Sequence, residues 1–167
     1  MYTKSIIFIV LISCLSSCYS FRGTSIPANV KSYYVDQTVI DPRATLTPGD
    51  LPELFMEALR AKIRNQSGLI YNDATPDIEF MSTITQFEIA DDVRGDGESL
   101  STLNKITATV KVEYLSAENE EENWNQNFSH TINYDPSIDL QSNLPSFIDE
   151  ILEQITEQVF NKAFTNW

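Results

Sequence analysis

Every second residue between Lys105 and Tyr114 is apolar, and this strict alternation constrains the fold more than any other feature of the chain. A two-residue period is typical of a β-strand with one buried face and one exposed face. Residues 123–134 repeat the pattern, so the sequence predicts a sheet whose polar face contacts either water or a partner. The side chains expected on this polar face are those of Lys105, Thr107, Thr109, Lys111, Glu113, Asn123, Asn125, Asn127, Ser129 and Thr131.

Two further strands are expected before this pair. Residues 30–40 are rich in β-branched and aromatic residues and predict the first strand of the chain. The second begins at Ile78, and its apolar residues change parity between Ile84 and Phe87, which predicts a β-bulge near residues 85–86.

Two helices are expected from apolar residues at helical spacing. The first begins after Asp50, which forms a capping box with Glu53, and ends near Gly68. The second starts at about Leu144, with Pro145 in its first turn. Its apolar stripe must be covered, and the apolar face of the sheet is the only surface large enough. The stripe consists of Phe147, Ile148, Ile151, Leu152, Ile155, Val159, Phe160, Phe164 and Trp167.

These elements predict an α+β fold. We expect a two-layer α/β sandwich in which a four-stranded sheet carries two helices packed on one face, in the order β-α-β-β-β-α. No repeat and no linker divides residues 28–167, which are expected to form a single domain long enough to bury its own core.

The N-terminal segment is typical of a removed secretory signal. A short apolar run follows Lys4 and ends in Leu15-Ser16-Ser17-Cys18, the pattern of a bacterial lipobox. We therefore expect a lipoprotein signal peptide at residues 1–17, acyl chains on Cys18, and a tether at residues 18–27. Two alternatives are cleavage before Cys14, which also follows a loose lipobox, and an ordinary secreted protein without lipid.

The charge of the chain excludes one class of partner. Its 11 Lys and Arg residues face 24 Asp and Glu residues, which gives a formal net charge of −13. Such a surface repels nucleic acid and anionic lipid at long range, so neither DNA nor RNA is expected to bind.

The sequence offers little for catalysis, and we expect no enzyme activity, no cofactor and no metal. The only histidine, His130, shares its strand parity with Trp124 and is expected to be a core or edge residue. The hairpin loop expected at residues 91–99 carries four carboxylates that offer oxygen ligands to calcium, but it lacks the EF-hand spacing. A solvated hairpin tip is the expected structure there.

Several segments, in this order and spacing, resemble the lipopolysaccharide-assembly lipoprotein family called LptE. The likeness extends over nearly the whole chain. It is carried by Cys18-Tyr19-Ser20-Phe21, Gly23-Thr24-Ser25-Ile26-Pro27, the strand from Leu103 to Tyr114, Asn123-Trp124, Phe128-Ser129, Phe160-Asn161 and Asn166-Trp167.

The resemblance implies a function without catalysis. Members of this family sit inside or against the outer-membrane β-barrel LptD, assist its assembly and contact lipopolysaccharide. By this likeness the chain is a lipid-anchored, periplasm-facing outer-membrane subunit, with Cys18 as the lipidated residue and Arg94 as a candidate phosphate contact. A polar sheet face also suits the hydrated interior of a barrel. The candidate barrel-facing residues are Lys105, Thr107, Thr109, Asn125 and Asn127.

A second group of candidate phosphate contacts comes from the residues themselves. Arg60, Lys62 and Arg64 form the best basic cluster of the chain, near the end of the first expected helix. Arginine and lysine pair with phosphate oxygens, but cations near a helix C-terminus also compensate the helix dipole. The alternative function is that of a tethered α/β lipoprotein that regulates another envelope machine, such as cell-wall synthesis.

Overall fold

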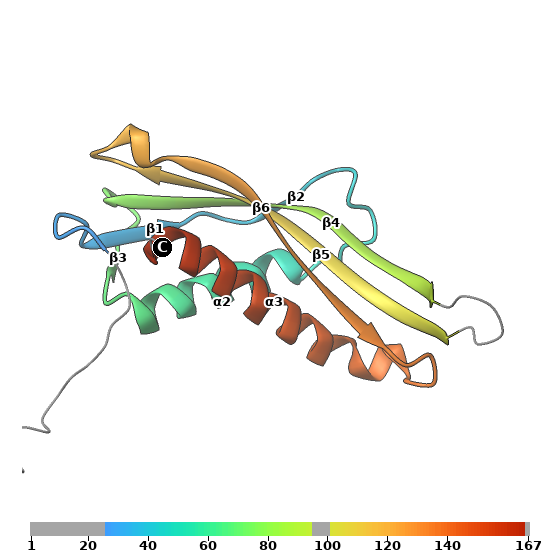
Figure 1. Cartoon of the computed structure of the whole chain (residues 1–167). Helices are drawn as coiled ribbons and strands as arrows, with labels where there is room; N and C mark the ends of the chain where they lie inside the picture. The colour runs from blue at the N-terminus through green and yellow to red at the C-terminus, as the bar shows by residue number, and fades with distance from the viewer. Residues whose placement is uncertain (1–25, 95–100, 166–167) are drawn as a thin grey trace, which may run out of the picture.

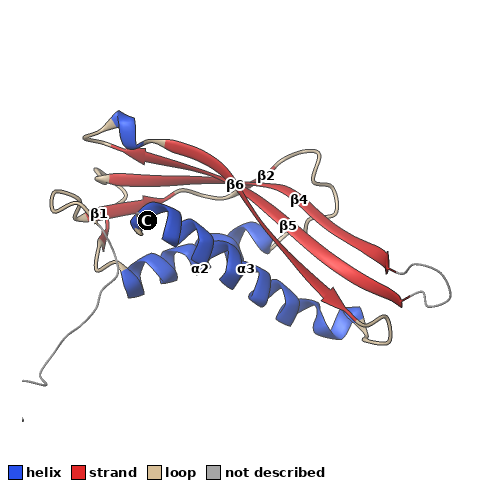
Figure 2. Ribbon diagram, in the orientation of Figure 1, coloured by secondary structure: helices blue, strands red, loops and turns tan. Residues whose placement is uncertain are grey.

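The structure, a computed structural model, describes residues 26–94 and 101–165. The predicted lipidation sites and signal peptide lie outside these residues, as do Trp167 and most of the expected 91–99 loop. The α+β class is confirmed, with two long helices against one mixed sheet (Figures 1 and 2). The strands are β1 (Ser32–Val35), β2 (Val39–Ile40), β3 (Ile70–Tyr71), β4 (Ile78–Arg94), β5 (Ser101–Ser116) and β6 (Trp124–Tyr134).

Three long strands form an antiparallel meander, with β4 paired to β5 and β5 to β6. On the other side of β4 lie β1 and β2, both parallel to it, and β3 runs parallel to β1. The order across the sheet is β3-β1-β4-β5-β6, so β6 forms one edge.

The predicted number of four strands is wrong, because the expected strand at residues 30–40 is divided. Its first part pairs Val35 with Phe80 and its second pairs Val39 with Thr83. The stretch from Val35 to Val39 is therefore one residue longer than the stretch of β4 that it pairs with. Between them, the Asp36 carboxylate accepts a hydrogen bond from the Gln37 backbone N–H (2.7 Å). Local side-chain bonds of this kind compete with a regular strand ladder. The break creates β1 and β2.

The strand β3 was not predicted. It has two residues, Ile70 and Tyr71, which pair with Ser32 and Tyr33. Two residues are too few to show a period, so sequence pattern alone does not reveal such a strand. Gly68, at φ 77°, provides the left-handed turn that brings the chain from the first helix into β3.

The predicted bulge is confirmed, and the predicted loop after it begins too early. The pairing of β4 with β5 shifts register between Ile84 and Gln86, which returns Phe87 to the buried side. Asp91–Arg94 continue β4, opposite Ser101–Asn104. The backbone pairing of the two strands extends beyond the last residues whose side chains alternate between apolar and polar.

The first helix, α2 (Leu51–Gln66), has the predicted extent, but its predicted capping box is wrong. Asp50 has helical backbone angles and makes no side-chain cap, so Glu53 has no partner there. Leu54 is apolar but 39% exposed, because it lies on the flank beside the second helix. The buried residues recur every fourth position at Leu51, Phe55, Leu59 and Ile63.

The second helix, α3 (Leu140–Phe164), begins four residues earlier than predicted. Asp139 is its N-cap and accepts a hydrogen bond from the Ser142 backbone N–H (3.1 Å). Pro145 therefore lies in the second turn, inside the helix, where it has no backbone N–H to donate to the Gln141 carbonyl.

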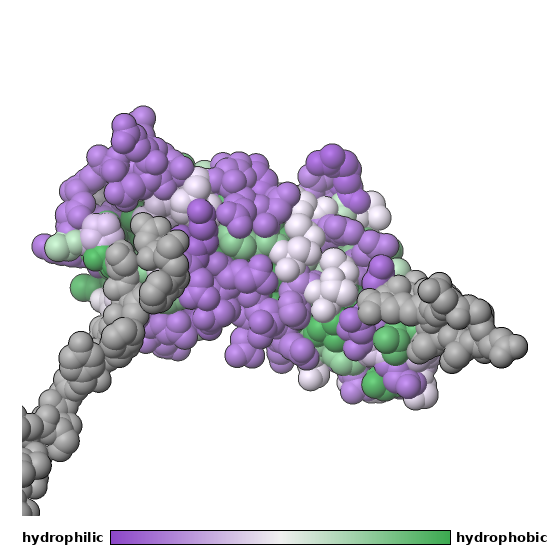
Figure 3. Space-filling view, in the orientation of Figure 1, coloured by the Kyte–Doolittle hydropathy of each residue, from purple (hydrophilic) through white to green (hydrophobic). Residues whose placement is uncertain are grey.

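Both helices cover the same face of the sheet, as predicted (Figure 1). The core between the layers joins residues from β1, β4, β5, β6 and both helices. Within the described residues, no helix is long and apolar enough to cross a membrane. In the space-filling view hydrophilic residues dominate the surface, and small apolar groups remain toward the far ends of β4 and β5 (Figure 3). Two exposed isoleucines, Ile89 and Ile138, belong to β4 and the β6–α3 connection.

Candidate functional site

The sheet face turned away from the helices is the first candidate. On β5 the alternate residues Ile106, Ala108, Val110 and Val112 are at most 1% exposed, whereas the residues between them are partly exposed. No described segment covers this second face. The predicted alternation is therefore confirmed, and the open face carries the polar residues that the sequence assigned to it except Asn123. Asn123 precedes β6, and its side-chain oxygen accepts a hydrogen bond from the Ser116 backbone N–H.

Hydroxyl and amide side chains form rows across this face. Thr107 and Thr131 share a hydrogen bond between their hydroxyls (2.8 Å). In the next row Thr109 donates to the Ser129 hydroxyl at 3.0 Å and lies 3.4 Å from Gln86 Oε1. Groups of these types both donate and accept, so the face can bind water or the polar wall of another protein equally well.

The open face carries charged residues of both signs, including Glu79 and Glu88 on β4. Lys111 and Glu113, two positions apart on β5, form an ion pair at 2.6 Å. Opposite them on β6 lie Asn127 and Asn125, both exposed, while Lys105 lies opposite Asn133. The five candidate barrel-facing residues, Lys105, Thr107, Thr109, Asn125 and Asn127, thus share one face.

The three basic residues of α2 do not converge on one site. Arg60 turns toward the sheet, where Nη2 donates to the Val35 carbonyl (2.9 Å) and the guanidinium lies 5.1 Å from the centre of the Tyr71 ring. Lys62 turns toward α3 and pairs with Glu157. The hydrogen bond from Lys62 lowers the pKa of the Glu157 carboxyl. Two of the three cations thus hold elements of the fold together.

The remaining cations lie apart from each other. Arg64 is exposed at the C-terminal turn of α2. The backbone of Arg94 ends β4, opposite Ser101, and its side chain lies outside the described residues. The structure therefore does not bring Arg94 beside Arg60 and Lys62, and the lipopolysaccharide contacts stay a prediction.

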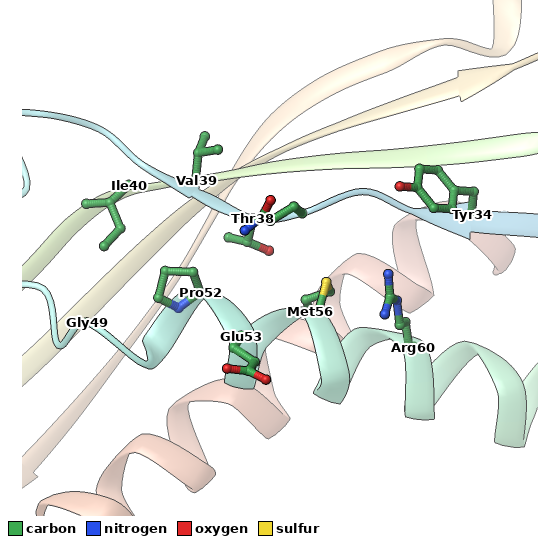
Figure 4. Close-up of a pocket in the computed structure, with 10 residues that line it drawn as sticks. Tyr34, Thr38, Val39, Ile40, Gly49, Pro52, Glu53, Met56 and Arg60 are labelled. Carbon is green, nitrogen blue, oxygen red and sulfur yellow. The ribbon is translucent and has the colours of Figure 1, made fainter. Parts of the chain in front are cut away.

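Sequence reasoning missed a hollow between the β1–β2 segment and α2 (Figure 4). Its volume is about 690 Å³. The Asp36–Gln37 interruption of an otherwise β-rich run was the only sequence signal of the break that opens it. Figure 4 shows Arg60 at one end and Gly49 at the other. The lining includes Tyr34, Thr38, Val39, Ile40, Pro52, Glu53 and Met56.

Titratable groups with shifted pKa values serve the fold. The pKa of Asp77 is lowered by hydrogen bonds from the backbone of Lys31 and from Ser32. Burial, reinforced by the charge of Glu122, raises the pKa of Tyr114 to about 12. His130 lies half-buried on the edge strand β6, opposite Ala108, as expected for an edge histidine. Among the described residues no set of His, Cys, Asp and Glu is placed to hold a metal ion.

Comparison with known proteins shows the fold and no family. No protein-family model matches the chain, and no curated protein matches it. A hypothetical protein from Chlamydia trachomatis has a similar structure, with a TM-score of 0.57, 13% identity, and coverage of 82% of this chain and 99% of that one. A minor lipoprotein from Acinetobacter baumannii matches with a TM-score of 0.50 and 7% identity, over 80% of this chain and 91% of that one.

A third solved structure has a different description. The putative neuraminyllactose-binding hemagglutinin homolog from Helicobacter pylori matches with a TM-score of 0.50 and 10% identity, over 87% of this chain and 89% of that one. At these identities the likeness shows the fold alone. The two-layer sandwich of this chain is thus a fold that occurs in bacterial lipoproteins.

Proposed function

We propose that the protein is an outer-membrane lipoprotein that docks its open sheet face against an LptD-type β-barrel. In this role it is the LptE-like subunit of the lipopolysaccharide translocon, and it acts as chaperone and plug of the barrel. The polar, uncovered face of β4, β5 and β6 carries the proposal. It suits the hydrated interior of an outer-membrane barrel, which is polar. The Cys18 lipobox supplies the anchor, and the fold is shared with a bacterial lipoprotein.

Contact with the barrel is the part of this function that the geometry supports best. A surface that binds a phosphorylated glycolipid needs unpaired cations, and Arg60 and Lys62 make contacts within the fold. Arg64 and Arg94 are the candidates that remain for lipopolysaccharide phosphate. We assign the protein no catalytic role, and a His130→Ala variant that keeps its fold should keep its function.

A cross-linking scan in living cells tests the proposed contact. Photoreactive residues at Lys105, Thr107, Thr109, Asn125 and Asn127 should cross-link to the barrel protein. Matched positions at Glu153 and Gln154, which are exposed on the solvent side of α3, should not. Cross-links from the helix positions alone, or equal yields from both sets, would contradict docking through the sheet face.

The acidic charge of the chain favours one alternative. With a net charge of −13 and two of its candidate cations paired internally, the molecule suits a purely protein partner in another envelope machine, such as cell-wall synthesis. Depletion separates the two functions. Loss of surface lipopolysaccharide supports the translocon, whereas septal or shape defects with normal lipopolysaccharide support the alternative.

A further inference from the structure

The edge strand β6 lacks the features that normally protect a sheet edge. Exposed edges are usually short, bulged, or marked by charged residues or proline, because a free edge invites another strand to pair with it. β6 has 11 residues, and its pairing with β5 runs without a register shift from Asn104↔Tyr134 to Tyr114↔Trp124. Between Trp124 and Tyr134 there is no Lys, Arg, Asp, Glu or Pro.

The free backbone groups of this edge can be identified. The Ala108 carbonyl accepts a hydrogen bond from Ser129 Oγ on β6, so the backbone of Ala108 is directed toward β6. The next carbonyl, that of Thr109, accepts a hydrogen bond from Thr85 and is directed toward β4. Ala108 pairs with His130, so the backbone of His130 is directed toward β5. Because backbone direction alternates along a strand, Ser129 and its odd-numbered neighbours face the open edge. The side chain of Gln158 approaches the Ser129 carbonyl from that side, at 3.4 Å.

Five residues thus present their N–H and C=O groups outward. In the part of the chain that the structure describes, none of these backbone groups pairs with another strand. The same residues carry their side chains on the open polar face, so the edge and the face form one continuous surface. The five are Asn125, Asn127, Ser129, Thr131 and Asn133.

The charges at the two ends of β6 indicate what can pair with it. Glu118 and the Glu120–Glu122 turn precede the strand, and Asp135 and Asp139 follow it. A second copy would bring its own acidic ends against these, whether the two strands ran parallel or antiparallel. Like charges placed side by side are destabilising, so a second copy is a poor occupant.

We propose that β6 accepts an extended segment of a partner polypeptide as an added strand, with an uncharged centre and Lys or Arg at both ends. Backbone hydrogen bonds to the five outward residues would hold the segment, and the flanking acids would select its charge. This goes beyond the proposed function, because any partner with such a segment can use the edge, whatever the sheet face contacts.

Proline substitutions test the proposal on the full mature protein. The probe is a synthetic peptide of alternating Thr and Val residues with two lysines at each end. Fluorescence anisotropy measures its binding, and amide hydrogen exchange measures protection of the β6 backbone. Asn127→Pro and Thr131→Pro remove an outward N–H that the β5–β6 ladder does not use, so the fold should persist. The matched controls Asn127→Ala and Thr131→Ala change the side chain and keep the N–H.

We expect the peptide to bind saturably and to slow exchange at the outward amides. Each proline should weaken binding at least about tenfold, and the alanine controls should not. Glutamates in place of the peptide lysines should also weaken binding, a comparison that does not depend on how well a proline variant folds.

Three results would overturn the proposal. The first is no binding at millimolar peptide, and the second is equal binding by the proline and alanine variants. The third is a dimer in sedimentation experiments that the prolines dissociate, since the edge would then serve a second copy. Barrel cross-links from Thr107 and Thr109 on the central strand report on the proposed function separately, whichever result the edge gives.

Discussion

Asp77 links the beginning of β1 to the beginning of β4. One carboxylate oxygen accepts hydrogen bonds from the backbone N–H groups of Lys31 and Ser32, both at 2.8 Å, and from the Ser32 hydroxyl at 2.9 Å. The Ser32 hydroxyl in turn accepts from the Asp77 N–H (3.1 Å). A carboxylate with several such donors is stabilised in its charged form, so the pKa of Asp77 falls below its usual 3.8.

This shift predicts how stability changes with pH. A carboxyl whose pKa is lowered by folding stabilises the native state above its ordinary pKa, and the contribution disappears as pH falls through the lowered value. We expect Asp77→Asn to unfold at lower urea than the wild type at pH 7, with the difference shrinking below about pH 4. Urea unfolding between pH 2.5 and 7 measures it. Asp73→Asn, in the same loop, is the control, and a constant difference at all pH values would contradict the prediction.

Arg60 supports a second residue-scale prediction. Its side chain is 24% exposed and joins α2 to the Val35 carbonyl and the Tyr71 ring. We expect Arg60→Met to lower the free energy of unfolding by about 1–3 kcal/mol, because it removes a charged hydrogen bond and a cation–π contact. The exposed Arg64→Met should change it by less than about 0.5 kcal/mol. If urea unfolding showed the same loss of unfolding free energy for both variants, the result would contradict a structural role for Arg60.

At the scale of elements, the bulge in β4 sets the registration of the sheet. Ile84 pairs with Val110 and Gln86 with Thr109, so Thr85 is the extra residue. Deleting Thr85 would leave Gln86 outward and Phe87 inward, with every pair of β4 and β5 unchanged. The bulge lets two apolar runs of opposite parity share one core.

We therefore expect deletion of Thr85 to give a folded protein that loses about 1–2 kcal/mol, largely through altered sheet curvature. Deletion of Thr83 also removes the bulge, but it places Ile84 opposite Lys111 on the open face and Thr85 opposite Val110 in the core, so it should cost about 3–5 kcal/mol. Circular dichroism and thermal unfolding of both deletions provide the test. Two equally unstable proteins would mean that Thr85 is not the bulge residue in solution.

Elements with many repeats of a period were predictable from sequence, and short ones were not. The alternation of β5 and β6 and the stripe of α3 each involve enough residues to fix both type and face. β3 has only two residues, and the break at Asp36 depends on local hydrogen bonds. Neither feature produces a periodic pattern of apolar residues in the sequence. The start of α3 was missed because Pro145 suggests a first turn more strongly than a lone Asp139 suggests a cap.

At the scale of the whole molecule, the same contrast applies to the candidate site. The open face follows from alternation, so its members were identified correctly as a surface. The basic group on α2 was identified from spacing alone, and positions two apart on a helix point in different directions. Arg60 and Lys62 accordingly meet the sheet and α3, and only the packed structure shows this.

The whole molecule also predicts how the protein is held at the membrane. The net charge of −13 repels anionic lipid, so we expect an acyl anchor on Cys18 to hold the protein at the membrane. We expect Cys18→Ala to move the protein from the membrane to the soluble fraction, and the control Cys14→Ala to leave it membrane-bound. Mass spectrometry of the mature protein should find acyl groups on Cys18. An unmodified thiol there would contradict the anchor.

The chain enters the domain at one extremity of its long axis. Ile26 lines a hollow with Gly68 and Ile70, beside the beginning of β4, whereas the end of β4 lies at the opposite extremity (Figure 1). The 17 residues of β4 extend over roughly 55 Å, about twice the thickness of a bilayer's hydrocarbon core. Eight chain steps from Cys18 to Ile26 add at most about 29 Å. With the anchor proposed at Cys18, the domain is therefore long enough to reach through the proposed barrel from one membrane surface to the other.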